Sequence, residues 1–150
     1  MSLEMRLRLQ FDNENIDFNL IAKMLQQAGM ANYAPEKHQL AFNNSQTVVF
    51  VFDNDNQNDS DLLVGFGRAI SDGAYQAAIY DVVVAENYQG KGIGKLIIAY
   101  ITEKNAHCNM ILYASIGKEK FYEKEKFRKM KTGMALFKDI EKMKNKGFTE

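Results

Sequence analysis

Hydrophobic and polar residues follow two different spacings along the first third of the chain. Over residues 6–11 every second side chain is apolar, which predicts a half-buried strand. After Asp17, which can cap a helix, apolar residues recur at helical spacing until Gly29 ends the pattern. Pro35 is typical of a first helical turn, so we predict a second, short helix that ends near Phe42.

Three segments in the middle of the chain predict strands. β-Branched and aromatic residues fill 47–52, and apolar residues return over 62–70, which predicts a hairpin. The polar run 53–61 between them lacks the glycine and the glutamate that a calcium-binding loop needs, so we interpret it as the turn. Residues 77–84 are almost continuously apolar, as expected for a central strand that is covered on both faces.

The second half of the chain passes again from strand to helix. Apolar residues form one helical stripe over 93–101, a short buried strand is predicted over 110–114, and a short helix over 118–126. Two closing strands are predicted over 127–131 and 134–137, followed by a weak, charged helix. A strand–helix–strand unit among antiparallel strands predicts a mixed sheet.

Composition fits one ordinary globular domain. The 150 residues are 46% hydrophobic and 25% charged, and no linker rich in glycine and serine divides them, so we predict a single domain over 1–150. A formal net charge of zero argues against a general nucleic-acid-binding protein, and no apolar run reaches the roughly 18 residues that span a membrane. One cysteine, Cys108, and a start without the apolar core of a signal peptide favour a cytoplasmic protein.

A glycine-rich segment between a buried strand and a helix carries the main chemical signal. Gly90, Gly92 and Gly94 let main-chain N–H groups approach a ligand closely, and the helix that follows adds unpaired donors and a partial positive charge. Lys91 and Lys95 add formal charge. The pattern predicts a cradle for phosphate groups.

The common nucleotide-binding motifs fit this segment less well. The Walker pattern needs a glycine and a hydroxyl residue where Gln89 and Leu96 stand, and the Rossmann spacing of glycines is absent. A nucleotide-binding protein of another class is therefore disfavoured. A tight turn without a ligand needs one or two glycines, not three at alternate positions beside two lysines.

Three segments together resemble the GNAT superfamily of acetyltransferases. Residues 89–94, QGKGIG, resemble the family's pyrophosphate loop, and 81–84, DVVV, resemble its central strand. Residues 121–127, FYEKEKF, resemble its Phe-Tyr-x-Lys-x-Gly-Phe element, although Lys126 stands where glycine is common. Residues 65–73, GFGRAISDG, resemble bacterial small-amine members that are similar to plant serotonin N-acetyltransferases.

The resemblance implies a fold and an activity. The fold is α/β (α+β), with a mixed, mostly antiparallel sheet of about six to seven strands flanked by about four helices. The activity is that of a cytoplasmic N-acetyltransferase, which moves an acetyl group from acetyl-CoA to a primary amine by direct transfer in a ternary complex, without a metal. The amine belongs to a small molecule or a peptide, no nucleic acid or membrane is expected as a partner, and a homodimer is allowed because members often dimerise. The sequence does not identify the amine.

The resemblance also assigns the cofactor-binding residues. In the family the loop holds the pyrophosphate, mostly through main-chain amides, and the central strand holds the pantetheine arm. The residues that it matches are Val82, Val83, Val84, Gln89, Gly90, Lys91, Gly92, Ile93, Gly94 and Lys95. The family further implies that a main-chain N–H near Val83 stabilises the oxyanion.

Tyr122 matches the family's acid. A phenol with a pKa of about 10 is protonated at neutral pH and can give its proton to the departing thiolate. The alternative is a tyrosine that only packs beside Phe121 on the short helix.

Asp81 is the one charged residue in the central apolar strand. A lone buried carboxylate is costly, so it needs a partner or a function. We expect it to take the proton of the amine or to pair with a cationic substrate, and the alternative is a structural pair with Arg68. Strict alternation places Asp81 on the same face as Ile79 and Val83, and opposite Tyr80.

Both Tyr122 and Asp81 are present, which favours an enzyme over the alternative of a non-catalytic, regulatory module that binds acyl-CoA. We expect Tyr33, Arg68 and Tyr80 to line the acceptor pocket, because aromatic rings suit a cationic or aromatic amine, with core packing as the alternative for each.

The remaining polar residues predict less. Residues 118–131 are rich in lysine and arginine. This segment either attracts the 3′-phosphate of CoA or forms a solvated helix face. His38 is expected on the surface, and Cys108 is expected to be buried rather than nucleophilic.

Overall fold

The structure is a computed structural model that describes residues 6–54 and 61–150. The chain forms two compact units, Met1–Leu112 and Tyr113–Glu150. The first unit holds the sheet and three helices, and the second holds two short helices. The prediction of a single domain stays a prediction. Most of the expected turn at 53–61 lies outside the described residues.

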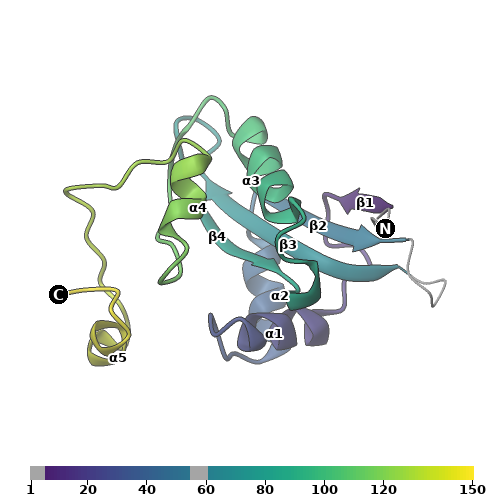
Figure 1. Cartoon of the computed structure of the whole chain (residues 1–150), viewed down its shortest axis with the longest axis horizontal. Helices are drawn as coiled ribbons and strands as arrows, with labels where there is room; N and C mark the ends of the chain where they lie inside the picture. Colours follow the sequence, from purple (N-terminus) through teal and green to yellow (C-terminus); the bar gives the residue numbers. More distant parts are fainter. Residues whose placement is uncertain (1–5, 55–60) are drawn as a thin grey trace. The chain divides into compact units, whose positions relative to one another are not determined.

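A five-stranded mixed sheet organises the described part of the first unit (Figure 1). The strands lie in sequence order, and the first four are antiparallel neighbours while the fifth runs parallel to the fourth. They are β1 (Leu7–Gln10), β2 (Thr47–Asp53), β3 (Leu62–Ser71), β4 (Gln76–Val84) and β5 (Asn109–Ile111). The predicted fold class is therefore confirmed, although this sheet is smaller than the six to seven strands expected.

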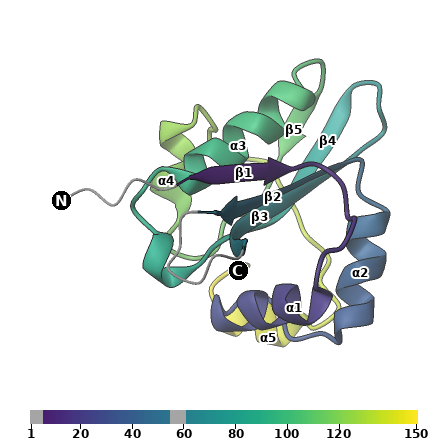
Figure 2. The same ribbon diagram turned by 90° about the vertical axis from the view of Figure 1, so that its right-hand side faces the viewer.

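Helices cover both faces of the sheet, as Figures 1 and 2 show. Helices α1 (Phe18–Gln27) and α2 (Pro35–Asn43) lie on one face, and α3 (Ile93–Lys104) lies on the other. No helix among the described residues is long and apolar enough to cross a membrane.

The predicted helix signals act as expected. The Asp17 carboxylate accepts a hydrogen bond from the main-chain N–H of Asn19 (2.9 Å), which satisfies one free donor of the first turn of α1. Pro35 is the first residue of α2, where a missing N–H costs nothing. Gly29 has a φ of +71°, as is usual just after a helix.

Three phenylalanines form the centre of the core between the sheet and helices α1 and α2. Phe42, Phe50 and Phe66 are fully buried, and their ring centroids lie 5.6 to 6.5 Å apart. Ile21 and Leu25 of α1 complete this cluster. These residues come from distant parts of the chain, so the cluster fixes α2 against the middle strands of the sheet.

Helix α3 lies close to β3 because two residues of that strand have no side chain. A Cβ atom built at Gly67 would lie 2.8 Å from Ile97 Cγ2, which is shorter than real contacts allow. One built at Gly65 would lie 3.1 Å from both Ile93 Cγ2 and Ile97 Cδ1, which is tighter than an ordinary contact. The glycines therefore set how closely the helix approaches the sheet.

The prediction of two closing strands in the second unit is wrong. This unit holds α4 (Glu119–Lys124) and α5 (Ile140–Asn145), and the two closing strands expected over 127–131 and 134–137 are not formed. Met134 and Leu136 are 97% and 91% exposed. An alternating pattern predicts a strand only when a neighbouring strand accepts its hydrogen bonds, and this unit contains none among its described residues.

Local interactions also direct this segment away from strand geometry. The N–H of Phe127 donates to the carbonyl of Tyr122 (3.0 Å), and the N–H of Lys126 donates to the carbonyl of Glu123 (3.1 Å). Lys126 has a φ of +75° between them. This is a Schellman turn, which ends α4 at the position where the family commonly has glycine.

Candidate active site

The glycine loop, residues 89–95, follows β4 through one short 3₁₀ turn, η1 (Glu86–Tyr88). Gly90 and Gly92 have φ angles of +77° and +86°, which favour glycine. A Cβ atom at either position would meet no protein atom within 4 Å. The loop thus combines a backbone shape that needs glycine with open space above the backbone, as a main-chain cradle for an anion requires.

The described residues do not use the main-chain donors of this cradle. Gly92 is the N-cap of α3 and supplies no side-chain cap, and the first bond inside the helix runs from the Leu96 N–H to the Gly92 carbonyl (3.0 Å). Among the described residues, no hydrogen bond has a main-chain N–H of 90–95 as its donor. These groups and the positive end of the 12-residue helix are therefore available to a phosphate.

Two side-chain hydrogen bonds hold the start of the loop against the sheet. The Tyr88 hydroxyl donates to the buried Asp53 carboxylate at the end of β2 (2.7 Å), and this hydrogen bond raises the pKa of Tyr88. The Gln89 side-chain amide donates to the carbonyl of Val84 (3.1 Å). Gln89 therefore holds the loop against the end of β4, while Lys91 and Lys95 are exposed.

The second half of β4 lacks a partner strand on one side within the described sheet. Strand β5 pairs only with residues 76–78, yet β4 continues to Val84. The segment that contains Val82 and Val83 is hydrogen bonded to β3 alone. This is the geometry that a ligand arm needs to pair with the main chain of β4.

A β-bulge interrupts β4 at Asp81. Arg68 faces Tyr80 and Phe66 faces Val83, so the single residue between them on β3 faces two residues of β4. Asp81 has a φ of +57°, an unusual conformation for a residue other than glycine. The bulge concentrates backbone strain next to the proposed oxyanion donor.

The predicted alternation of side chains along β4 is wrong because of the bulge. Val83 packs in the core on the α1 and α2 side, and Tyr80 lies on that same side because Arg68 stacks over its ring (5.2 Å). Val82 lies on the opposite side, next to Gly67 and Ile97 of the α3 face. The extra residue shifts the alternation by one, which sequence spacing alone does not reveal.

Asp81 and Arg68 form a half-buried ion pair. The Asp81 Oδ2 and Arg68 Nε atoms are 2.7 Å apart, and the side chains are 19% and 13% exposed. Arg68 also donates to the Ser45 hydroxyl (3.2 Å) and lies over the ring of Phe42 (5.7 Å). The structural pair expected as the alternative for Asp81 is therefore present, and its role as a base stays a prediction.

His38 is buried, so the prediction that it lies on the surface is wrong. It is 4% exposed and stands one helical turn before Phe42 on the face of α2 that meets the sheet. Its Nε2 atom is buried and has no hydrogen-bond partner in the described structure. Burial lowers the pKa of His38, with Arg68 and Lys37 acting in the same direction and Asp81 against them. The i, i+4 spacing to Phe42 was the signal that the sequence offered.

Of the predicted acceptor residues, Tyr33 lies against this buried histidine. The Tyr33 ring centroid is 5.8 Å from that of His38, and the Lys37 ammonium lies 4.3 Å from the Tyr33 centroid. Tyr33 is 54% exposed. Tyr33 therefore contacts His38 near the surface, while Arg68 lies over Tyr80 and pairs with Asp81 at the bulge of β4.

Tyr122 belongs to the second unit and is described by itself. It lies on α4, half-buried, with ring centroids 5.0 Å from Phe121 and 5.9 Å from Phe127. Burial raises the pKa of the Tyr122 hydroxyl. A phenol in this environment keeps its proton at neutral pH, as an acid must. The role of Tyr122 stays a prediction.

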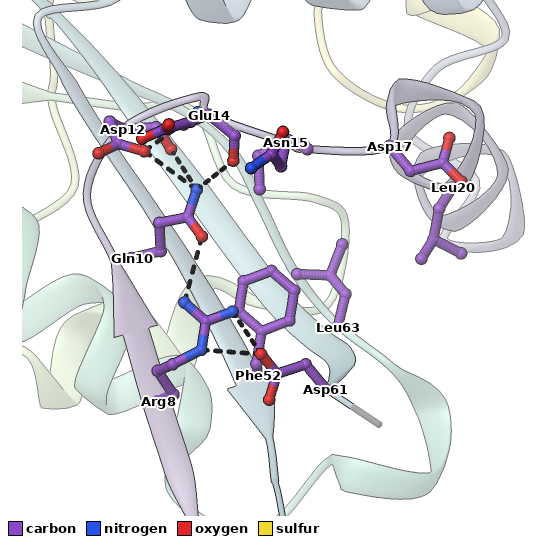
Figure 3. Close-up of a pocket in the computed structure, with 11 residues that line it drawn as sticks. Arg8, Gln10, Asp12, Glu14, Asn15, Asp17, Leu20, Phe52, Asp61 and Leu63 are labelled. Carbon is purple, nitrogen blue, oxygen red and sulfur yellow. Dashed lines mark hydrogen bonds and ion pairs between the residues drawn. The ribbon is translucent and has the colours of Figure 1, made fainter. Parts of the chain in front are cut away.

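An open groove of about 670 Å³ lies beside β1 and the start of α1, and none of the predicted site residues lines it (Figure 3). Its polar side chains are largely occupied with each other. Arg8 pairs with Asp61 (2.7 Å), and the Gln10 amide donates to Asp12 and to the carbonyl of Glu14. The part of the chain that the structure describes contains no group of three or more His, Cys, Asp and Glu residues suited to a metal ion.

A family model and a related protein both match this chain over more than half of its length. Residues 44–129, more than half of the chain, match the family described as an acetyltransferase (GNAT) domain. The chain is 30% identical over 125 residues to a protein of Pyropia yezoensis named uncharacterized N-acetyltransferase ycf52, and the match covers 81% of this chain and 71% of that protein.

Solved structures share the fold. A probable acetyltransferase from Staphylococcus aureus has a TM-score of 0.73 at 24% identity, over 88% of this chain and 99% of that one. Arabidopsis thaliana NAA60, solved in complex with acetyl-CoA, has a TM-score of 0.70 at 17% identity, over 82% of this chain and 85% of that one.

Proposed function

Because this chain belongs to the GNAT family of acetyltransferases, we propose that it transfers the acetyl group of acetyl-CoA directly to a primary amine. The observation that carries the proposal is the glycine loop, whose main-chain N–H groups donate no hydrogen bond to the described residues and whose Gly90 and Gly92 leave open space above the backbone. A tight turn that binds no ligand does not require open space beside its main-chain N–H groups.

The residues present fit acetyl-CoA. The amides of 90–95 and the N-terminus of α3 would hold the pyrophosphate, with Lys91 and Lys95 adding charge. The main chain of β4 from Val82 to Val84 would pair with the pantetheine arm, on the side where β5 has ended. Structural relatives include one solved with acetyl-CoA, Arabidopsis NAA60. Bound acetyl-CoA supplies the activated thioester.

The roles of the chain's own groups follow from the chemistry of acyl transfer. The amine nitrogen attacks the thioester carbonyl, the carbon–sulfur bond breaks, and the thiolate takes a proton. We assign the oxyanion donor to a main-chain N–H near Val83, and the acid to the Tyr122 hydroxyl. The raised pKa of Tyr122 keeps that proton in place until the thiolate forms.

The acceptor belongs to the class of small or peptide amines. Tyr33 and Tyr80 offer aromatic faces to a cationic or aromatic amine. Tyr33 is exposed and lies beside the buried His38, so an amine from solvent can reach its ring. A small aromatic amine is the acceptor that these rings fit best.

Two measurements test the proposal. Titration calorimetry with acetyl-CoA and with CoA should show binding, and the absence of affinity for both would contradict it. Thiol release from acetyl-CoA, measured with tyramine, spermidine and a peptide with a free N-terminus, should then identify an acceptor. Binding without thiol release with any amine would favour a regulatory acyl-CoA-binding module instead.

A further inference from the structure

A buried imidazole without a hydrogen-bond partner stands beside the ion pair at the β4 bulge. His38 is 4% exposed, and its Nε2 atom has no partner in the described structure. Buried polar atoms are nearly always paired, so this exception needs a physical reason. We propose that His38 is the general base of the reaction: its imidazole takes the proton that the acceptor amine must lose. The inference rests on the proposed acetyl transfer.

The position of His38 fits this role. Its helical neighbour Phe42 packs under the guanidinium of Arg68, and Arg68 is bound to Asp81 at the bulge. His38 therefore faces the sheet on the same side as Asp81 and Val83. Tyr33 lies against its ring and is exposed, so an amine that binds the ring of Tyr33 would lie close to the imidazole.

The charges around His38 keep it ready to accept a proton. Arg68 on β3 and Lys37 on the same helix act on it as cations, and Asp81 on β4 is the one anion that opposes them. Burial and the two cations lower the pKa of His38, so the imidazole is neutral and holds a free lone pair at pH 7. The ring of Tyr33 carries no charge at this pH.

Asp81 is less suited to the same task. Its Oδ2 atom already accepts a charge-assisted hydrogen bond from Arg68 at 2.7 Å, and such a bond stabilises the ionised carboxylate. The Asp81 carboxylate is thus already occupied by a cation, whereas the Nε2 atom of His38 has no partner in the described structure. We therefore assign Asp81 a positioning role: it holds Arg68 beside His38.

The proton balance of the step is complete. The ammonium group of the substrate gives one proton to His38, and the freed lone pair forms the bond to the carbonyl carbon. The carbon–sulfur bond breaks, and the thiolate takes the Tyr122 proton, which the second proton of the nitrogen restores. His38 then releases its proton to water, so that one proton leaves for each acetyl group transferred.

The test compares H38Q with the wild type on the amine from the panel that gives the highest rate. H107Q is the matched control, because His107 is exposed and lies at the end of α3. We expect H38Q to lower kcat about 100-fold or more and to leave the Kd for acetyl-CoA within about twofold, whereas H107Q changes neither. A loss of less than about threefold in H38Q would overturn the proposal.

Two further readouts separate a base from a merely structural residue. In the wild type kcat should fall as the pH drops below the pKa of a histidine, and H38Q should lack this acidic limb. Free imidazole should restore part of the activity of H38A. It should leave the activity of H107A unchanged. A wild-type profile that is flat below pH 6.5 would contradict the proposal even where a variant fails to fold. Absence of any wild-type thiol release would instead refute the acetyl transfer on which the inference rests.

Discussion

Two regions beside β4 are built in opposite ways. The glycine loop presents main-chain N–H groups from consecutive residues, and most of its side chains are exposed, with Ile93 as the buried exception. The imidazole cluster, formed by His38, Arg68 and Asp81, joins three side chains from α2, β3 and β4, and it is mostly buried. The loop is therefore specified locally by glycine, whereas the cluster exists only when the core around Phe42 is packed.

Substitutions in the two regions should therefore affect different properties of the protein. A change in the loop should affect ligand affinity beyond its effect on folding, because the loop donors are not part of the core. A change in the cluster should affect stability and catalysis together, because the same side chains complete the core and face the bulge. The following variants test this contrast, from the largest expected effect to the smallest.

Gly92→Val should give the largest effect. Gly92 has a φ of +86°, which a β-branched residue avoids, so the first turn of α3 must change shape and its donors must move. We expect the Kd for acetyl-CoA to rise about 100-fold, equivalent to about 2.7 kcal/mol. Calorimetry measures this change. Gly73→Val is the matched control, because Gly73 has a φ of +74° in the β3–β4 turn, away from the loop. Equal losses of affinity in both variants would contradict a local role for the loop.

Arg68→Met should lower the free energy of unfolding by about 2 kcal/mol. It leaves the half-buried Asp81 carboxylate without its cation, and partial exposure keeps the cost below that of a fully buried pair. Urea denaturation gives the value. Arg8→Met is the control, since the exposed Arg8–Asp61 pair should contribute less than about 1 kcal/mol. Similar losses in the two variants would show that the cluster is an ordinary surface pair.

Lys126→Gly should raise the free energy of unfolding by about 1 kcal/mol. Lys126 has a φ of +75° in the Schellman turn after α4, where glycine adopts the conformation without strain. Lys124→Gly, inside the same helix, should lower it by a similar amount. Chemical denaturation of the two variants distinguishes them, and a loss of stability in Lys126→Gly would contradict the assignment of strain to this turn.

The smallest effect should be a pH dependence of stability. Burial makes the folded pKa of His38 lower than its value in the unfolded chain, which is about 6.5. Below pH 6.5 the unfolded chain therefore binds more protons than the folded one, so stability falls as the pH falls towards the folded pKa. Above pH 6.5 this contribution vanishes. We expect the loss of unfolding free energy between pH 7.5 and pH 5.5 to be smaller in H38Q than in the wild type, and equal losses would show that His38 is not desolvated.

The sequence predicted the elements whose signals are local. Asp17 and Pro35 begin the helices that they were expected to begin, and β2, β3 and β4 fall where apolar runs occur. The glycine loop was equally predictable from the sequence, because its backbone shape depends on consecutive residues. The resemblance did not fix where β5 ends, and in the structure its pairing with β4 stops at Ala78.

The features that the sequence did not predict depend on distant partners. The bulge at Asp81 arises where β4 pairs with β3, and no local pattern shows where a register slips. The burial of His38 follows from the docking of Phe42 into an aromatic cluster assembled from three segments. The closing strands expected over 127–137 needed a neighbouring strand that the described residues of their unit do not supply.

Gly67 connects the central sheet with the helix that begins at the glycine loop. A methyl group there would lie 2.8 Å from Ile97 and 3.2 Å from Ile101, so the side chains of α3 or the helix itself would have to shift. The N-cap of this helix is Gly92, inside the loop. A single carbon atom on β3 would therefore disturb the packing of the helix that follows the loop, without any change in the loop sequence.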